Sequence, residues 1–134
     1  MIGASLAGVR KEVTDMATTI GSTVHPRYKG VGVWRVKSIA RLQQPIRYPD
    51  SVLGNVAYEP RILWLQSPAH SRVLWFAYWI STRGTKGRRA WGGGAPMLEE
   101  GVLLELLKDA IANGMFTKSF LKKLKAELDA AIAG

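Results

Sequence analysis

The residues best suited to chemistry lie in one glycine-rich, basic stretch, Thr82–Pro96. Cationic side chains pair with phosphate oxygens, and the N–H groups of glycine-rich backbone can surround an anion. A tryptophan in the stretch could stack on a base of a single-stranded nucleic acid. The alternative is that the stretch is only a flexible connector. Its candidate binding residues are Arg83, Lys86, Arg88, Arg89 and Trp91.

The distribution of charge indicates an anionic partner. The formal net charge is +9, and residues 25–97 contain twelve Lys or Arg but only two acids, a net +10. Residues 1–24 are neutral overall, and residues 98–134 carry −1. A field concentrated in this way attracts nucleic acids, acidic protein surfaces or anionic lipid headgroups. The alternative is a basic surface that only keeps the protein soluble.

A segment with alternating apolar and polar residues, Val31–Leu42, contributes further cations. This period of two predicts a β-strand with one face that can be buried. The buried face would consist of Trp34, Val36, Ala40 and Leu42. The opposite face would carry the cations Arg35, Lys37 and Arg41, together with Val33 and Ile39. Combined with the glycine-rich stretch, these three cations would form one cationic surface.

Recognised catalytic and metal-binding motifs are absent from the sequence. A dinucleotide-binding pattern begins at Gly30 but lacks its third glycine, and there is no phosphate-binding Walker loop. The two histidines, His25 and His70, lack the spacing of a metal site. Asp50 and Glu59 could each serve as a general base, but a role in a salt bridge is simpler. We therefore expect a binding module without metal or cofactor rather than an enzyme.

Location is indicated by two features of the composition. The chain has no cysteine, which is typical of proteins from a reducing compartment, so we expect a cytoplasmic protein. The most apolar region, residues 62–80, is interrupted by polar and charged residues. A membrane-spanning helix would not carry these residues at its centre, and we expect no membrane partner.

Two aromatic runs, Arg61–Gln66 and Arg72–Thr82, predict a β-hairpin with a five-residue loop. The second run is apolar on both faces and therefore needs cover on both sides. Its cover could be helices on one face and a curled sheet, a barrel wall or a second copy of the chain on the other, the last most simply as a homodimer. In the rival interpretation, the tryptophan-rich strands line a ligand pocket or a subunit interface. The residues of such a pocket or interface would be Trp64, Trp75, Tyr78 and Trp79.

Helices are predicted at both ends of the chain, where apolar residues recur every three or four positions. They cover Leu6–Ile20, Leu98–Ala112 and a last segment for which Thr117 is the N-cap. The last helix carries an apolar stripe and several lysines. A DNA-reading helix-turn-helix is disfavoured because this helical region is net negative. Residues 43–58, with two prolines and a Gly-Asn pair, are expected to form an extended loop with turns.

These elements predict one α+β domain over residues 1–134. It would consist of an N-terminal helix and linker (1–24), a basic β-rich core (25–97) and a C-terminal helical hairpin (98–134). The core would be an antiparallel β-sheet or a small, partly closed barrel of about three to five strands. We expect it to bind RNA or DNA through its cationic strand face and glycine-rich loop. The alternative is a ligand-binding or homo-oligomeric module with a tryptophan-rich pocket or interface.

Overall fold

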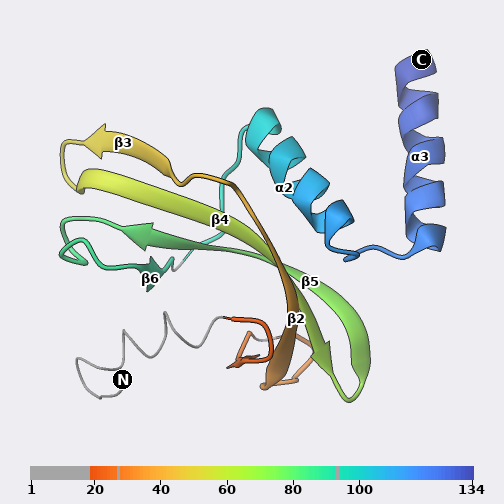
Figure 1. The fold of residues 1–134 in the computed structure, drawn as a ribbon, viewed down its shortest axis with the longest axis horizontal. Coiled ribbons are helices and arrows are strands. Elements are labelled where there is room, and N and C mark those ends of the chain that lie inside the picture. The colour runs from red at the N-terminus through yellow and green to blue at the C-terminus, as the bar shows by residue number, and fades with distance from the viewer. Residues whose placement is uncertain (1–18, 27, 93) are drawn as a thin grey trace.

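The computed structural model describes residues 19–26, 28–92 and 94–134, which form a mixed α+β fold (Figure 1). An antiparallel sheet curls into a half-barrel, and two helices follow it in the chain. The helix predicted at Leu6–Ile20 lies almost wholly outside the described residues. The elements are β1 (Thr23–Val24), β2 (Trp34–Arg41), β3 (Ile46–Asp50), β4 (Gly54–Ser67), β5 (His70–Ser81), β6 (Ala90–Trp91), α2 (Glu100–Ala112) and α3 (Lys118–Ala133).

The sheet is organised around the long strand β4. One edge of β4 pairs with β5, and the other pairs first with β3 and then with β2, so the order is β1-β2-β4-β5-β6 with β3 beside β4. Residues 42–45, between β2 and β3, lie opposite Glu59 and Pro60. A proline lacks the N–H that a ladder needs. Pro60 therefore falls in the part of β4 that is between its two partners on that edge.

The loop predicted for residues 43–58 is wrong from Ile46 onward, because β3 and the start of β4 form a hairpin. Asp50 closes the turn, since its carboxylate accepts the N–H groups of Val52 and Leu53 at 2.8 Å each. These two bonds hold the pKa of Asp50 below its usual value. The hairpin predicted from the two aromatic runs is present as β4 and β5. Its strands are longer than expected, and its turn contains only Pro68 and Ala69.

A β-bulge in β2 changes which residues share a face. Val36 pairs with Leu65 but Ser38 pairs with Trp64, so Lys37 is an extra residue and the alternation shifts by one. The single cationic face predicted for β2 is therefore wrong: Arg35 lies on one face of the sheet and Arg41 on the other. For the same reason, Ile39 packs with Trp34 and Val36, whereas Ala40 and Leu42 pack on the opposite side.

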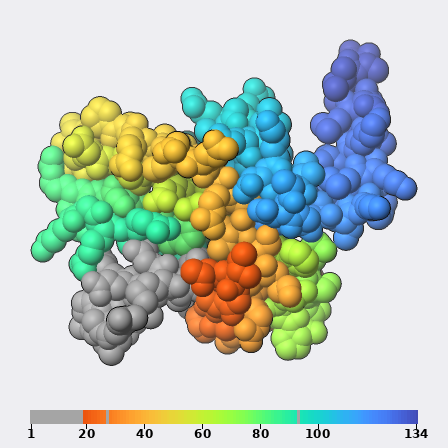
Figure 2. Space-filling model, viewed as in Figure 1, coloured from red at the N-terminus to blue at the C-terminus, as the bar shows by residue number. Residues whose placement is uncertain are grey.

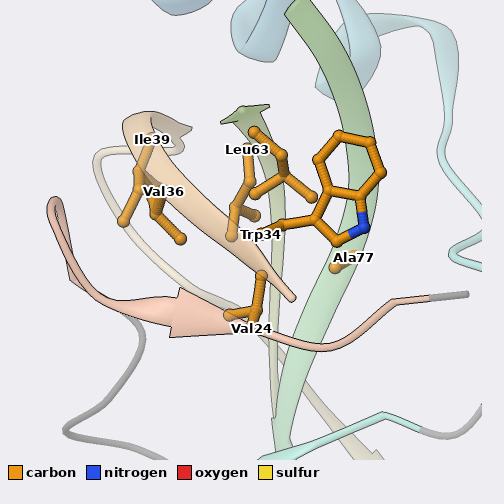
Figure 3. Packing of buried hydrophobic residues seen from close by; sticks show 7 residues of the cluster. Val24, Trp34, Val36, Ile39, Leu63 and Ala77 are labelled. Atoms are coloured by element: carbon orange, nitrogen blue, oxygen red, sulfur yellow. The ribbon is translucent and has the colours of Figure 1, made fainter. Parts of the chain in front are cut away.

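The two faces of the sheet have different cores. We call one the tryptophan face, because it carries four of the five tryptophans, Trp34, Trp75, Trp79 and Trp91. Figure 3 shows six residues of its core pointing toward one another from β1, β2, β4 and β5. The other is the helix face, where Leu106 and Ala110 of α2 pack with Met115 against Ala40 and Ile62. β5 is thus partly covered on both sides within the chain, because Ala77 belongs to the first core and Leu74 packs against the second, but Phe76 remains 40% exposed.

α2 also covers the open edge of β2. Every second residue of an edge strand directs its backbone N–H and C=O groups outward, and these groups need partners. Three residues spaced four apart, two in α2 and one at its C-cap, provide these partners. The spacing fits because four helical residues rise about 6 Å, which is close to the rise of about 6.7 Å for two strand residues. Asn113 Nδ2 donates to Ile39 O (3.1 Å), the Arg41 N–H donates to Asp109 Oδ2 (2.8 Å), and the Gln43 N–H donates to Glu105 Oε2 (3.1 Å).

The last helix, α3, stands away from the sheet (Figures 1 and 2). Thr117 is its N-cap as predicted, because the hydroxyl accepts the Phe120 N–H at 3.1 Å. No residue of α3 is buried, so α2 is the helix that packs on the sheet. No helix in the described part of the chain combines the length and the apolar character needed to cross a membrane.

Removing the Asp109 carboxylate should destabilise the fold. We expect Asp109→Ala to lower the free energy of unfolding by about 1–2 kcal/mol, because the Arg41 N–H loses a charged acceptor. Urea unfolding measures this loss, and hydrogen exchange should show faster exchange at the Arg41 amide. Lys108→Ala, an exposed change on the same helix, is the control. Equal stability of the two variants would contradict the proposed role of the edge contact.

Candidate functional site

The loop between β5 and β6 is a well-bonded turn. Each backbone N–H from Thr82 to Arg88 donates a hydrogen bond to an acceptor within the protein. Lys86 and Gly87 both have positive φ, at 56° and 80°, which makes the chain reverse sharply. Arg83 is held against the β3–β4 turn, since its N–H donates to Leu53 O at 2.7 Å. The loop is therefore neither a flexible connector nor a cradle of free N–H groups, and only its side chains remain for an anion.

Four arginines lie together on the tryptophan face, and we call them the arginine band: Arg41, Arg47, Arg61 and Arg89. The strand register places three of them, because Arg41 pairs with Arg61, and Arg47 pairs with Ala57 two positions beyond Glu59. Arg89 reaches the same face through its bond to Glu59. Residues 57–61 of β4 span only about 13 Å, so the band is compact.

Glu59 joins two members of the band. Its carboxylate contacts Arg61 Nη2 at 2.9 Å and Arg89 Nε at 3.2 Å. The side chains of Arg61 and Glu59 are only 9% and 17% exposed, so this is a largely buried ion pair. Burial lowers the pKa of Arg61 to about 10, and Glu59 opposes the fall. Arg61 therefore stays charged at neutral pH, and the band keeps a net positive charge.

A stack of indole rings supports the band. Trp79 lies under both Arg61 and Arg89, with the guanidinium carbons 4.9 and 5.0 Å from a ring centroid. Trp91 stacks nearly parallel on Trp75 and on Trp79, at centroid distances of 5.1 and 4.8 Å. Trp75 and Trp79 lie on one strand face and both hold the Trp91 ring, so a base that stacked on Trp91 would compete with these indoles.

Three hollows adjoin the band. One of about 550 Å³ lies between Arg41 and α2, and its walls include Glu105, Lys108 and Asp109. Another of about 470 Å³ lies between the β3–β4 hairpin and the β5–β6 loop, beside Arg47. The smallest, of about 160 Å³, lies at the gap between β2 and β3, beside Arg41 and Arg61.

The strands and the β5–β6 loop at this end of the sheet carry seven cations and two acids. The side chains of Glu105 and Asp109 add two carboxylates at the edge, where they accept the N–H groups of Gln43 and Arg41. The cations are Arg41, Arg47, Arg61, Arg83, Lys86, Arg88 and Arg89, and the acids on the strands are Asp50 and Glu59.

Of the residues predicted to bind nucleic acid, the structure brings some together and separates others. Arg41 and Arg89 join the band, while Arg83, Lys86 and Arg88 lie in the adjacent loop. Arg35 is on the opposite face, where Nη1 donates to Gly21 O at 2.9 Å, and Lys37 occupies the bulge. The predicted pocket or interface residues also separate. Trp75 and Trp79 lie on the tryptophan face, whereas Tyr78 and Trp64 lie on the helix face, with Arg72 3.9 Å above the Trp64 ring.

Two site residues, Arg47 and Arg61, were missed. For Arg61 the reason is that the strand was predicted to begin only there, which left its partner Glu59 outside the strand. Extending the alternation backward would have placed Glu59 and Arg61 on the same face as Leu63 and Leu65. That pattern predicts a buried ion pair next to a core. Arg47 carried no comparable signal, because its face depends on the pairing of β3 with β4.

The histidines take structural positions. His25 Nδ1 lies 2.9 Å from Gly32 O, and His70 stacks on Trp34 at a centroid distance of 5.5 Å. Within residues 19–26, 28–92 and 94–134, no group of three or more histidine or acidic side chains is placed to hold a metal ion. Comparisons with protein-family models, curated proteins and solved structures found no match for this chain. The functional inference therefore rests on the geometry of the protein itself.

Glu59 should be important for stability because it neutralises a buried cation. We expect Glu59→Gln to lower the free energy of unfolding by about 3 kcal/mol, since Arg61 would remain buried without its anion. Replacing both residues, as Glu59→Gln with Arg61→Met, should recover most of the loss. Asp129→Asn is the matched control, because it breaks the exposed Lys125–Asp129 pair and should cost under about 0.5 kcal/mol. A loss of similar size in the double variant would contradict this interpretation.

Proposed function

We propose that the protein binds a polyanion, specifically RNA or DNA, across the arginine band and the β5–β6 loop. The observation that carries this proposal is the gathering of seven cations at one end of the sheet, around the hollows beside Arg47 and Arg61. Fewer acids lie near them: Asp50 and Glu59 on the strands, and Glu105 and Asp109 at the edge beside Arg41. Asp50 is engaged in its turn and Glu59 in its ion pairs. The net field therefore favours phosphate groups.

Recognition through phosphates suits the state of the other groups. The loop N–H groups are occupied and Trp91 is stacked on two neighbouring indoles, so base contacts have little support from these residues. Exposed guanidinium and ammonium groups, such as those of Arg47 and Lys86, remain accessible. We expect binding that depends weakly on sequence and strongly on salt.

The test removes two exposed cations of this surface. Arg47→Ala with Lys86→Ala should weaken binding to short RNA and DNA strands equally across sequences, and should make the salt slope shallower by about 0.7 per lost phosphate contact on single strands. Fluorescence anisotropy at several salt concentrations measures both effects. Arg35→Ala with Lys37→Ala removes the same charge elsewhere and should have a smaller effect. Equal losses in the two double variants, or no binding tighter than about 10⁻⁴ M by the native chain, would reject the site.

A second proposal, self-association, is favoured by the exposed apolar stripe of α3. Phe120, Leu128 and Ile132 are 46%, 52% and 84% exposed, and Leu121 and Leu124 are half-buried beside them. β5 is already partly covered within the chain, whereas no residue of α3 is buried, so a homodimer would form through α3 rather than through the tryptophan-rich strands. An amphipathic helix that packs on nothing is stabilised when its stripe is buried.

The charges of α3 favour an antiparallel pair with a second copy. The lysines lie in its first half, and the acids Glu127 and Asp129 lie in its second half. In an antiparallel pair, the basic half of each helix lies beside the acidic half of its partner, whereas a parallel pair would place like charges together. The lysines are Lys118, Lys122, Lys123 and Lys125.

Introducing a charge into the stripe should prevent this association. We expect the native chain to be a dimer at tens of micromolar by light scattering, and Leu128→Asp to be a monomer, because its carboxylate would be buried in the interface. Ala126→Asp adds the same charge on the opposite side of α3 and should leave the dimer intact. A monomeric native chain, or a dimer that tolerates Leu128→Asp, would reject the α3 interface.

A further inference from the structure

A further hollow, of about 370 Å³, lies on the helix face, and no member of the arginine band lines it. Its walls come from β3, β4, β5 and the segment that leads into α2. The lining is aromatic and aliphatic apart from one carboxylate, and its volume is that of a small-molecule site. The residues that matter here are Tyr48, Tyr58, Tyr78, Met97 and Glu99.

Register places three tyrosines around this hollow. Tyr48 pairs with Val56, and Tyr58 pairs with Ile46 on one side and Ile80 on the other. The rings of Tyr58 and Tyr78 are 4.9 Å apart and inclined at 48°. Three π systems on one face of a sheet provide a surface of negative potential where the ring faces are exposed.

Hydrogen bonds hold two of these rings in place. The Tyr58 hydroxyl accepts the Met97 N–H at 3.2 Å, and the Tyr78 hydroxyl accepts the Gly94 N–H at 3.4 Å. Burial raises the pKa of Tyr58, so its phenol stays neutral at physiological pH. The rings are thus positioned before any ligand arrives, which reduces the entropy lost on binding.

Gly92 is required for the position of Tyr78. A Cβ atom at residue 92 would lie only 1.8 Å from the Tyr78 ring, so the ring packs directly on the backbone that follows β6. This contact gives the first glycine of the Gly92–Gly94 run a specific role, which is to admit an aromatic ring.

The charge at this hollow is opposite to that of the molecule as a whole. Glu99 lines it and makes no capping hydrogen bond to α2, although it is the N-cap residue. Glu100 follows in the first turn. Together the two carboxylates outweigh the roughly +0.5 charge of a helix N-terminus. None of the described residues that line the hollow is Lys or Arg.

We propose that this hollow binds the trimethylammonium group of a small-molecule ligand. Aromatic rings attract such a cation, and its methyl groups fit an apolar wall better than a strongly hydrated primary ammonium does. The Glu99 carboxylate supplies the opposite charge at the rim. The site differs from the polyanion surface in its face of the sheet and in its charge, and Tyr48 lines both this hollow and the one beside Arg47.

The test compares choline with 3,3-dimethylbutan-1-ol, a neutral molecule of the same shape, by calorimetric or NMR titration of the full chain. We expect choline to bind at least about fivefold more tightly, because only the cation gains from the rings and the carboxylate. Ethanolamine, a primary amine, should bind more weakly than choline. Equal affinity for choline and its neutral isostere, or no choline binding at tens of millimolar, would overturn the proposal.

Variants then assign the contacts. Tyr48 is 40% exposed, so Tyr48→Leu should fold normally and weaken choline binding several-fold, whereas Tyr48→Phe should retain it because the π face remains. Glu99→Gln should reduce the preference for choline over the neutral isostere, and Gly92→Ala should weaken binding by displacing Tyr78. Unchanged choline affinity in Tyr48→Leu would overturn the site. A trimethyllysine peptide that binds more tightly than choline would overturn the small-molecule assignment.

Discussion

The fold depends on how the open edge of β2 is satisfied. β2 pairs with β4 on one side, but on its other side β1 and the two residues before it cover only Trp34 to Val36. The remaining edge would expose backbone donors and acceptors to other chains. Side chains of and next to α2 bond to this edge at every second residue, which aligns the helix antiparallel to the strand. The same alignment places Leu106 and Ala110 over the helix face. It also places Glu99 beside the hollow that Tyr48, Tyr58 and Tyr78 line.

β4 separates two kinds of chemistry on its two faces. Side chains alternate between the two faces along β4, and residues 57, 59 and 61 lie on the tryptophan face. Glu59 and Arg61 are therefore among arginines and indole rings. Tyr58 and Pro60 alternate with them and lie on the helix face. There the tyrosine rings line a hollow that has Glu99 at its rim. A positive surface and a hollow suited to a cation therefore lie a few residues apart on one strand, separated by the thickness of the sheet. This arrangement would allow the proposed polyanion and the proposed ammonium ligand to bind without competing for the same charge.

The glycine-rich stretch shows how composition alone can suggest the wrong mechanism. Glycines between cations are typical of phosphate-binding loops. Here the N–H groups of the β5–β6 loop already donate to acceptors within the protein, mainly the hydroxyl and carbonyl oxygens of Thr82 and Thr85. Gly87 permits a sharp turn, and Gly92 admits the ring of Tyr78. The glycines thus serve conformation and packing, while the side chains of the stretch remain the part that can meet an anion.

The sequence by itself determined the fold class, the β4–β5 hairpin, α2 and the Thr117 cap, because periodicity and capping are local properties of the chain. It also determined where the positive charge is concentrated. Only the tertiary structure decided which cations share a face. Regular alternation would put Arg35 and Arg41 on the same face, and the bulge at Lys37 puts them on opposite faces. It likewise decided that Glu105, Asp109 and Asn113 bond to a strand edge, and that Tyr48 meets Tyr58 and Tyr78. These contacts join residues far apart in the chain, and no local pattern encodes them.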